Sequence, residues 1–328
     1  MMSELERDYT LDVPEESNLQ QALDKRLGPS RLAVGDVLQN ASLNDLLGVL
    51  QAAWLHDAAV QVKDLGAIPT NTLGVDLSQL RSITEVDTIS GLCTVERCAT
   101  PASIATALES EGLWLDSGHF SDQESPIGPA AEAGEAGVLI ASISAALADG
   151  THFSTPLAPR RATGPNPDYI LIGSEGRTGV ITHLTLRVRR IPDWSRAIQI
   201  DGPTVGLIEA TRKTLRTYRP SYAWLERPAR GKVRLFMIPG VLPVPMHEFQ
   251  SFNTTPPTAK ESQPSPPKAQ PKRIGWRALT EQFKKTKCWA GPLDAHGGWV
   301  RGPQWPNAQD EATLEHVRQS LDPAEVLR

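Results

Sequence analysis

The segment with the clearest chemical potential is GSEGRTGVIT, residues 173–182, in which three glycines and one acidic side chain precede an apolar tail. Glycine is needed where the backbone adopts a positive φ or where another group approaches it closely. That group is either a ligand, which would bind main-chain N–H and C=O groups, or the protein's own chain in a tight turn. The residues alone leave both interpretations open.

Cysteine and histidine give weaker indications of chemistry. The three cysteines, Cys93, Cys98 and Cys288, do not make a disulfide framework. Cys93 and Cys98 lie on an expected strand, where their odd separation places them on opposite faces. The seven histidines are scattered without metal-binding spacing. We therefore expect no metal site, and we expect His119 and His152 to lie on the surface.

The composition is that of an ordinary globular protein. The chain has 328 residues, of which 40% are hydrophobic and 22% charged, and its net charge is −5. This balance provides no overall basic field, so nucleic acid is not an expected partner. No apolar run is long enough to span a membrane, and the acidic, polar start lacks the pattern of a secretory signal. We expect a cytoplasmic protein.

Two helices have marked beginnings. Ser42, followed three residues later by Asp45, predicts a helix with a variant of the capping box, and apolar residues follow at helical spacing. Thr100 is the expected N-cap of another helix, with Pro101 in its first turn and Gly112 positioned to end it.

Alternating patterns predict strands near Gln61, around Asp76, on both sides of a turn at Ser90–Gly91, and after the glycine segment. Residues 116–136 are expected to be a loop, because they are rich in glycine, serine and acidic side chains. After Pro192 the pattern indicates a β-α-β unit of a second domain, with its helix near 204–218.

The proline-rich stretch 253–273 cannot pack a core, so we expect a disordered, extended linker there. A final helix is expected near 308–321. The expected division is an N-terminal extension (1–40), a first domain (41–192), the first part of a second domain (193–252), the linker (253–273) and the C-terminal part of the second domain (274–328).

Two segments carry a resemblance to a known family. VDLSQLRSITEVDTISGLCTVERCATPASIATALESEGLWL, residues 75–115, resembles the FAD-binding domain of the p-cresol methylhydroxylase (PCMH) and vanillyl-alcohol oxidase type. APRRATGPNPDYILIGSEGRTGVITHLTLRVRRIP, residues 158–192, is similar to alkyl-dihydroxyacetone phosphate synthases and to FAD-binding subunits of glycolate oxidase. The resemblance implies an α+β fold in which two α/β subdomains hold FAD between them, followed by a small cap domain.

The resemblance also implies site residues. In the family, the glycine loop and the start of the next strand present main-chain groups to FAD. The matching positions, with two from the expected first phosphate-binding loop, are Gly66, Thr70, Gly164, Glu175, Gly176, Arg177, Thr178, Gly179, Val180 and Ile181. No His or Cys matches a tethering position, so any FAD is expected to be non-covalent.

The sequence departs from the family at two places. The first phosphate-binding loop, usually a glycine-rich anion nest, is here DLGAIPTNTLG, residues 64–74, where Pro69 removes an N–H donor and Asp64 adds negative charge. The central segment is shortened and carries Glu124, Glu132 and Glu135, which are unfavourable beside a diphosphate.

Two functions follow from the resemblance. The first is an FAD-dependent oxidoreductase, or a flavoprotein subunit, that oxidises a 2-hydroxy acid or similar alcohol, with a partner subunit that carries electrons as an option. The alternative is a degenerate, flavin-free relative that binds a partner protein. No catalytic residue is assigned: His296 is either a base or a strand-end histidine, and Arg160 and Arg161 are either substrate-binding or solvated.

Overall fold

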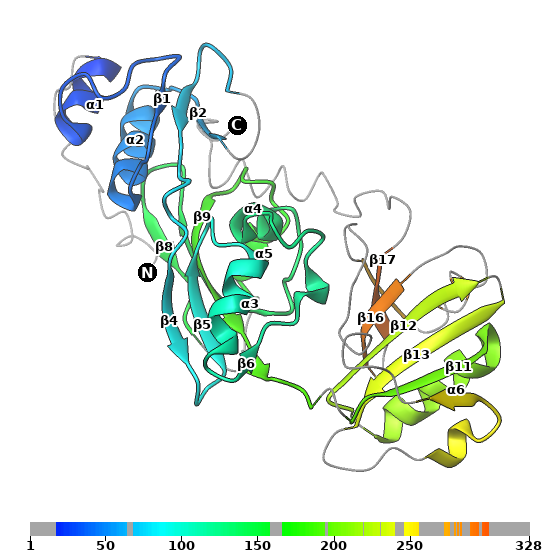
Figure 1. The fold of residues 1–328 in the computed structure, drawn as a ribbon. Coiled ribbons are helices and arrows are strands. Elements are labelled where there is room, and N and C mark those ends of the chain that lie inside the picture. Colours follow the sequence, from blue (N-terminus) through cyan, green and yellow to red (C-terminus); the bar gives the residue numbers. More distant parts are fainter. Residues whose placement is uncertain are drawn as a thin grey trace, which may run out of the picture.

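The protein is described from a computed structural model. It describes residues 18–63, 68–157, 166–193, 196–218, 220–229, 231–239, 246–255, 272–275, 279, 281, 283, 289–294 and 297–301. The predicted helix near 308–321 and the residues Asp64, Gly66, Arg160, Arg161, Gly164, Cys288 and His296 lie outside these ranges. The fold mixes helices and sheets, as the sequence predicts (Figure 1).

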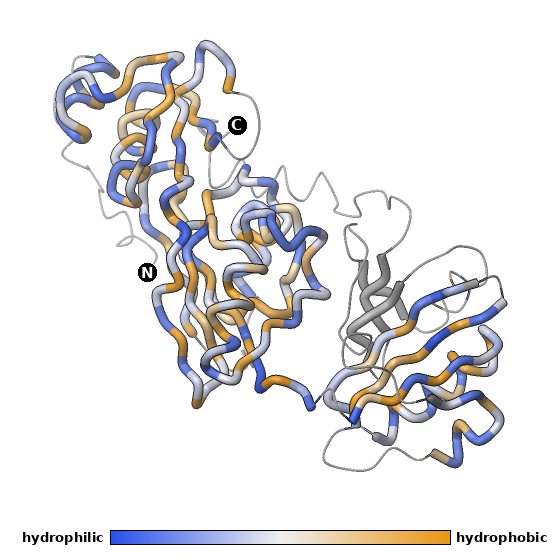
Figure 2. Tube along the Cα trace, viewed as in Figure 1, coloured by the Kyte–Doolittle hydropathy of each residue, from blue (hydrophilic) through white to orange (hydrophobic). Residues whose placement is uncertain are grey.

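A small parallel sheet opens the fold. Its strand order is β1 (Val37–Leu38), β3 (Leu73–Val75) and β2 (Val60–Val62). Helices α1 (Leu19–Leu27) and α2 (Leu43–Leu55) pack against each other beside it. Their buried side chains form one hydrophobic core with the sheet. Although the sequence gives little pattern before residue 41, α1 therefore belongs to this core through Ala22, Leu23 and Leu27; the rest of α1 is mostly hydrophilic (Figure 2).

An antiparallel sheet of five strands forms the second layer. Its order is β4 (Ile83–Asp87), β5 (Leu92–Glu96), β9 (Val180–Arg187), β7 (Ile140–Ala146) and β8 (His152–Ser154). The helices α3 (Pro101–Glu109), α4 (Ile127–Glu132) and α5 (Asp168–Leu171) lie on one side of this sheet (Figure 1). Together they enclose a second hydrophobic core.

The two cores meet at the start of β9. Val180 belongs to the first core with Ala146, whereas the next residue, Ile181, belongs to the second core with Ala145. Successive strand residues point to opposite faces, so the first two residues of β9 contribute one side chain to each core. The glycine segment therefore enters the fold at the boundary between them.

A small antiparallel sheet pairs β6 (Leu113–Trp114) with β10 (Arg189–Arg190). The described elements that follow β10 in the chain form a seven-stranded sheet with one long helix. The strand order is β14 (Asn253–Thr255), β11 (Ile198–Pro203), β13 (Lys232–Ile238), β12 (Tyr222–Ala229), β16 (Trp289–Asp294), β17 (Gly297–Arg301) and β15 (Lys272–Gly275). Helix α6 (Thr204–Thr217) lies against β11 and β13, with the 3-10 helix η4 (Met246–Phe249) beside it. The expected helix near 204–218 is confirmed.

Three local expectations need correction. Residues 116–136 are not all loop, because they contain the 3-10 helix η2 (Ser117–His119) and α4. His119 is only 3% exposed, so it is not a surface residue, whereas His152 is exposed. The ends of the segment 253–273 are extended: β14 pairs with β11, and β15, which begins at Lys272, pairs with β17. Residues 256–271 lie outside the described ranges.

Candidate functional site

The glycine loop, defined here as residues 173–179, connects α5 to β9 through a run of left-handed backbone conformations. Gly173 has a φ of 80°, Glu175 of 55° and Gly176 of 78°. Glycine adopts this region without the steric penalty of a Cβ atom, so Gly173 and Gly176 permit the turn. Glu175 adopts it as one of the few non-glycine residues to do so.

Gly179 has a different role, because its φ is not in the left-handed region. A Cβ atom at this position would lie 3.0 Å from Cδ2 of Leu171, 3.1 Å from Cδ2 of Leu147 and 3.2 Å from the carbonyl oxygen of Ala146. These distances are shorter than ordinary van der Waals contacts. The missing side chain at residue 179 thus makes room for the protein's own core.

Hydrogen bonds fix the beginning of the glycine loop on α4. The N–H of Gly173 donates to the carbonyl of Ala131 at 3.0 Å, and the N–H of Glu175 donates to the carbonyl of Glu132 at 2.8 Å. Both acceptors lie at the C-terminal end of the helix, where carbonyls lack helical partners. The loop therefore serves as the C-terminal cap of α4.

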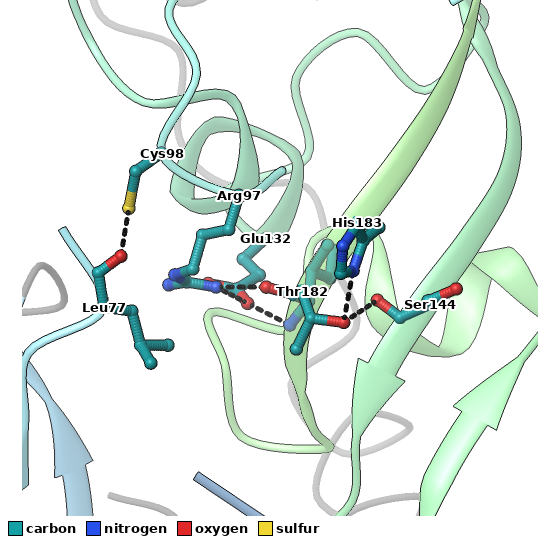
Figure 3. Close-up of polar contacts among 8 residues, drawn as sticks. Leu77, Arg97, Cys98, Glu132, Ser144, Thr182 and His183 are labelled. Atoms are coloured by element: carbon teal, nitrogen blue, oxygen red, sulfur yellow. Dashed lines mark hydrogen bonds and ion pairs between the residues drawn. The ribbon is translucent and has the colours of Figure 1, made fainter. Parts of the chain in front are cut away.

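The start of β9 is held by a buried ion pair (Figure 3). Arg97 and Glu132 are both 0% exposed, with Nη1 2.8 Å from Oε1 and Nη2 3.0 Å from Oε2. The Ile181 N–H donates to Oε1 of Glu132 at 2.8 Å, and Nη1 of Arg97 donates to the Ile181 carbonyl at 2.8 Å. Both main-chain groups of Ile181 are therefore already paired within the protein.

Some polar groups of the glycine loop have no hydrogen-bond partner among the described residues. The main-chain N–H groups of Gly176, Thr178 and Gly179 make no hydrogen bond to another described residue. Ser174 is only 1% exposed, and its hydroxyl has no hydrogen-bond partner among the described residues. Unpaired buried donors cost free energy unless something binds them. Within the described part of the chain, these groups are the ones in the loop that suit a ligand.

The predicted site residues thus fall into different environments. Val180 and Ile181 are buried in the two cores, and the hydroxyl of Thr178 donates to the carbonyl of Ile170 at 2.7 Å. Glu175 and Arg177 form an exposed ion pair at 2.8 Å. All of these residues belong to one continuous segment, so the chain itself brings them together.

Thr70 is exposed in the loop between β2 and β3. In the same loop, Thr72 is fully buried and its hydroxyl has no hydrogen-bond partner among the residues that the structure describes. Lys63 and Asp76 flank this loop and form an ion pair at 2.8 Å. A negative charge at Asp76 is therefore balanced locally.

Sequence reasoning missed the roles of Arg97, Glu132 and Ser174. From the sequence, Glu132 is an unfavourable charge beside a diphosphate, but in the structure Arg97 forms an ion pair with it. The partner of Glu132 is 35 residues away, so no local spacing signals the pair. Ser174 was within the glycine segment, but a serine in a glycine turn is ordinary turn chemistry.

No group of three or more metal-binding side chains occurs among the residues that the structure describes. The thiol of Cys98 donates to the carbonyl of Leu77 at 3.3 Å, and Cys93 is buried in β5. Burial lowers the pKa of His183, which lies 4.0 Å from Glu96, an acid that acts in the opposite direction. In the described ranges, no helix has the length and apolar character needed to cross a membrane.

Sequence and fold comparisons both support the FAD-binding family of PCMH type as the class that this chain resembles. The relatives in sequence are the proteins named "Uncharacterized FAD-linked oxidoreductase YgcU" from Escherichia coli (strain K12) and from Escherichia coli O157:H7. Each is 27% identical over 194 residues, which is 55% of this chain and 37% of the relative. The matched region is thus little more than a third of the relatives' length.

Solved structures of alkyldihydroxyacetonephosphate synthase share the fold. Two crystal forms align with TM-scores of 0.60 and 0.59 at 12% and 11% sequence identity. Each alignment covers 94% of this chain and 79% of the synthase chain. No model of a known protein family matches the chain.

Proposed function

We propose that this protein is an FAD-binding oxidoreductase, or a flavoprotein subunit, that oxidises a 2-hydroxy acid or similar alcohol. The observation that carries the proposal is the coincidence of two likenesses: a sequence match to a protein named as an FAD-linked oxidoreductase, and a fold match over 94% of the chain. The substrate class comes from the resemblance of the glycine segment. A cytoplasmic location and a partner subunit that carries electrons are part of the same proposal.

The polar groups of the glycine loop fit part of such a cofactor. The N–H groups of Gly176, Thr178 and Gly179, with the hydroxyl of Ser174, would hold FAD, since main-chain N–H groups without a partner among the described residues suit anionic and carbonyl oxygens. FAD, when bound, would accept the hydride that the alcohol carbon loses. Val180 and Ile181 would act as support, because their side chains fill the cores and the main-chain groups of Ile181 are paired.

The loop between β2 and β3 would supply a second set of contacts. The buried, unpartnered hydroxyl of Thr72 and the exposed Thr70 are its described polar groups. Asp76 would not repel a diphosphate strongly, because Lys63 is paired with it. The assignments of Gly66 and Gly164 to the cofactor stay predictions, as does the division of the chain into domains.

The flavin content of the purified protein tests the proposal. We expect the protein to show a flavin absorption spectrum, either as purified or after incubation with excess FAD. Acid precipitation should then release all of the flavin to the supernatant. Ser174→Ala should weaken flavin binding, whereas the control Ser144→Ala, in β7, should not. A protein that takes up no FAD at any concentration would refute the proposed function, and flavin retained in the precipitate would refute non-covalent binding.

One observation favours the alternative of a flavin-free, partner-binding subunit. The resemblance assigns the main-chain groups of Ile181 to FAD, but they are already hydrogen-bonded to the side chains of Arg97 and Glu132. The comparisons favour the first function, and the same flavin measurement separates the two.

A further inference from the structure

The ion pair of Arg97 and Glu132 is unusual because of its complete burial. Arg97 is among the largest fully buried side chains of the described residues. Removing two charges from water is costly, and apolar residues of similar volume often replace such a pair without loss of stability. The stability of the core alone therefore does not explain why Arg97 and Glu132 occupy these positions. Their contacts with other groups indicate what the pair does.

Those contacts converge on the glycine loop. Glu132 accepts from Glu175 through its main-chain carbonyl and from Ile181 through its carboxylate, each at 2.8 Å. One residue thus holds the chain near both ends of the loop. Arg97 adds a second pair of bonds at the far end, through its side chain to the Ile181 carbonyl and through its N–H to the Thr182 carbonyl at 2.9 Å.

Gly128 allows α4 to lie against Arg97. A Cβ atom at residue 128 would lie 2.7 Å from Cγ of Arg97 and 3.1 Å from its carbonyl oxygen. The N–H of Gly128 donates to that carbonyl at 2.8 Å. The close approach brings Glu132, one turn further along the helix, onto the guanidinium (Figure 3).

We infer that Arg97 and Glu132 are positioning residues, which hold the glycine loop in the conformation in which the N–H groups of Gly176, Thr178 and Gly179, unpaired among the described residues, can bind a ligand. The inference rests on the proposed function for the identity of that ligand, FAD. The pair itself does not touch the cofactor in this proposal. It orders the loop before binding, so the ligand does not have to supply that ordering free energy.

The test compares the double variant Arg97→Met/Glu132→Leu with the wild type by hydrogen exchange and by flavin titration. The double variant removes both charges and keeps apolar volume in the core. We expect the amides of residues 173–181 to exchange about tenfold faster or more, with little change in α3. We expect the dissociation constant for FAD to rise by about the same factor, because the loop must then be ordered on binding.

Two further variants keep the test decisive. Leu108→Ala, in α3 of the same core, is the control: it should lower overall stability without a selective effect on residues 173–181. Arg97→Met/Glu132→Gln replaces the double variant if that protein does not fold. The amide oxygen of Gln still accepts from Ile181 and no unpaired charge is left buried, so we expect a smaller, still selective increase in exchange.

Unchanged exchange in the loop, or an equal increase throughout the second core, would overturn the inference, because the pair would then be ordinary packing. A tighter binding of FAD by the double variant would also overturn it, since the pair would then exclude the cofactor. Selectively faster exchange in a protein that binds no FAD would support the positioning role and refute the proposed function. Faster exchange with weaker FAD binding would support both.

Discussion

Gly179 shows most directly how a single residue connects the glycine loop to the core. We expect Gly179→Ala to lower the free energy of unfolding by about 1–3 kcal/mol, a usual cost of overpacking. The leucine methyl groups can yield by a few tenths of an ångström, but the Ala146 carbonyl belongs to the sheet. Chemical denaturation measures the effect.

The matched control for this variant is Gly137→Ala. Gly137 also borders the second core, but a Cβ atom there would lie 3.5 Å from Cγ2 of Ile172, an ordinary contact. We expect a change below about 0.5 kcal/mol at this control position. Equal losses at the two positions would contradict the steric explanation.

Cys93 is expected to be chemically inert in the folded protein. Burial raises the pKa of its thiol to about 11, and the side chain is 0% exposed. Because the thiolate is the reactive form, iodoacetamide at neutral pH should leave Cys93 unmodified until the protein unfolds. Peptide mass mapping of native and denatured samples gives the answer, and rapid native labelling would show that β5 opens.

Asp76 should make stability depend on pH. Burial alone would raise the pKa of Asp76, but hydrogen bonds from the Lys63 side chain and from Ser78 outweigh it and lower the pKa. A carboxyl with a lowered folded-state pKa stabilises the protein above its unfolded pKa, and this contribution disappears as pH falls through the folded value.

The variant Asp76→Asn removes that contribution. The difference in unfolding free energy between wild type and variant should be largest near neutral pH and should shrink below roughly pH 4, where carboxyl groups titrate. Denaturation curves at a series of pH values measure it. A difference that stays constant over this range would show that the ionised form of Asp76 is not what stabilises the protein.

At the scale of elements, helix beginnings were predictable because their signals are local. Ser42 and Asp45 form the capping box of α2, and Thr100 and Ser103 cap α3 with Pro101 in the first turn. Such signals act within three residues and do not depend on the rest of the fold. The hairpin at Ser90–Gly91 was predictable for the same reason.

Helix α4 and the ion pair were not predictable in this way. The helix spans six residues, begins after Pro126 without a side-chain cap, and buries Ile127 and Ala131 in the second core. A helix this short is stabilised mainly by tertiary contacts. The residues of the glycine loop could be identified from the sequence. The groups that hold the loop could not, because they belong to α4.

The segment 253–273 contains both the short strand β14 and the proline-rich stretch that follows it, and the two should contribute differently to stability. β14 and β15 lie at opposite edges of the seven-stranded sheet, so the chain between them is tested by replacement and not by deletion. A Gly/Ser segment of equal length in place of residues 256–271 keeps β14 and β15, so we expect the melting temperature to stay nearly unchanged, because a stretch with this many prolines cannot pack a core. Extending the replacement to 253–273 also removes β14 and its pairing with β11, and should lower the melting temperature. Equal effects of the two replacements would contradict this distinction.

At the scale of the whole molecule, the seven-stranded sheet contacts the residues around Trp114 and Asp116 through an aromatic and polar junction. The hydroxyl of Tyr222 donates to Oδ1 of Asp116 at 2.9 Å, and both residues are nearly fully buried. The ring of Tyr222 packs edge-on against Trp114, with centroids 5.0 Å apart. Nη2 of Arg189 lies 3.9 Å from Oδ2 of Asp116, so this carboxylate is the centre of the junction.

Tyr222→Phe tests the junction, because it removes the hydroxyl and keeps the ring. We expect a loss of about 1–3 kcal/mol in unfolding free energy, the usual cost of removing a hydrogen bond to a buried charged group. Tyr218→Phe is the control, since Tyr218 lies at the end of α6 and its hydroxyl has no hydrogen bond to a described residue. Similar small effects at both positions would show that the hydrogen bond to Asp116 contributes little.

The central position of β9 has a consequence for how the chain folds during synthesis. β9 lies between β5 and β7, and the hydroxyl groups of Thr94 and Thr185, which meet across β5 and β9, are separated by 91 residues. Until β9 leaves the ribosome, the hairpins β4–β5 and β7–β8 have no common partner and expose open edges. A nascent chain stalled before residue 180 should therefore be prone to aggregate, and closure of this sheet should be a late, slow step.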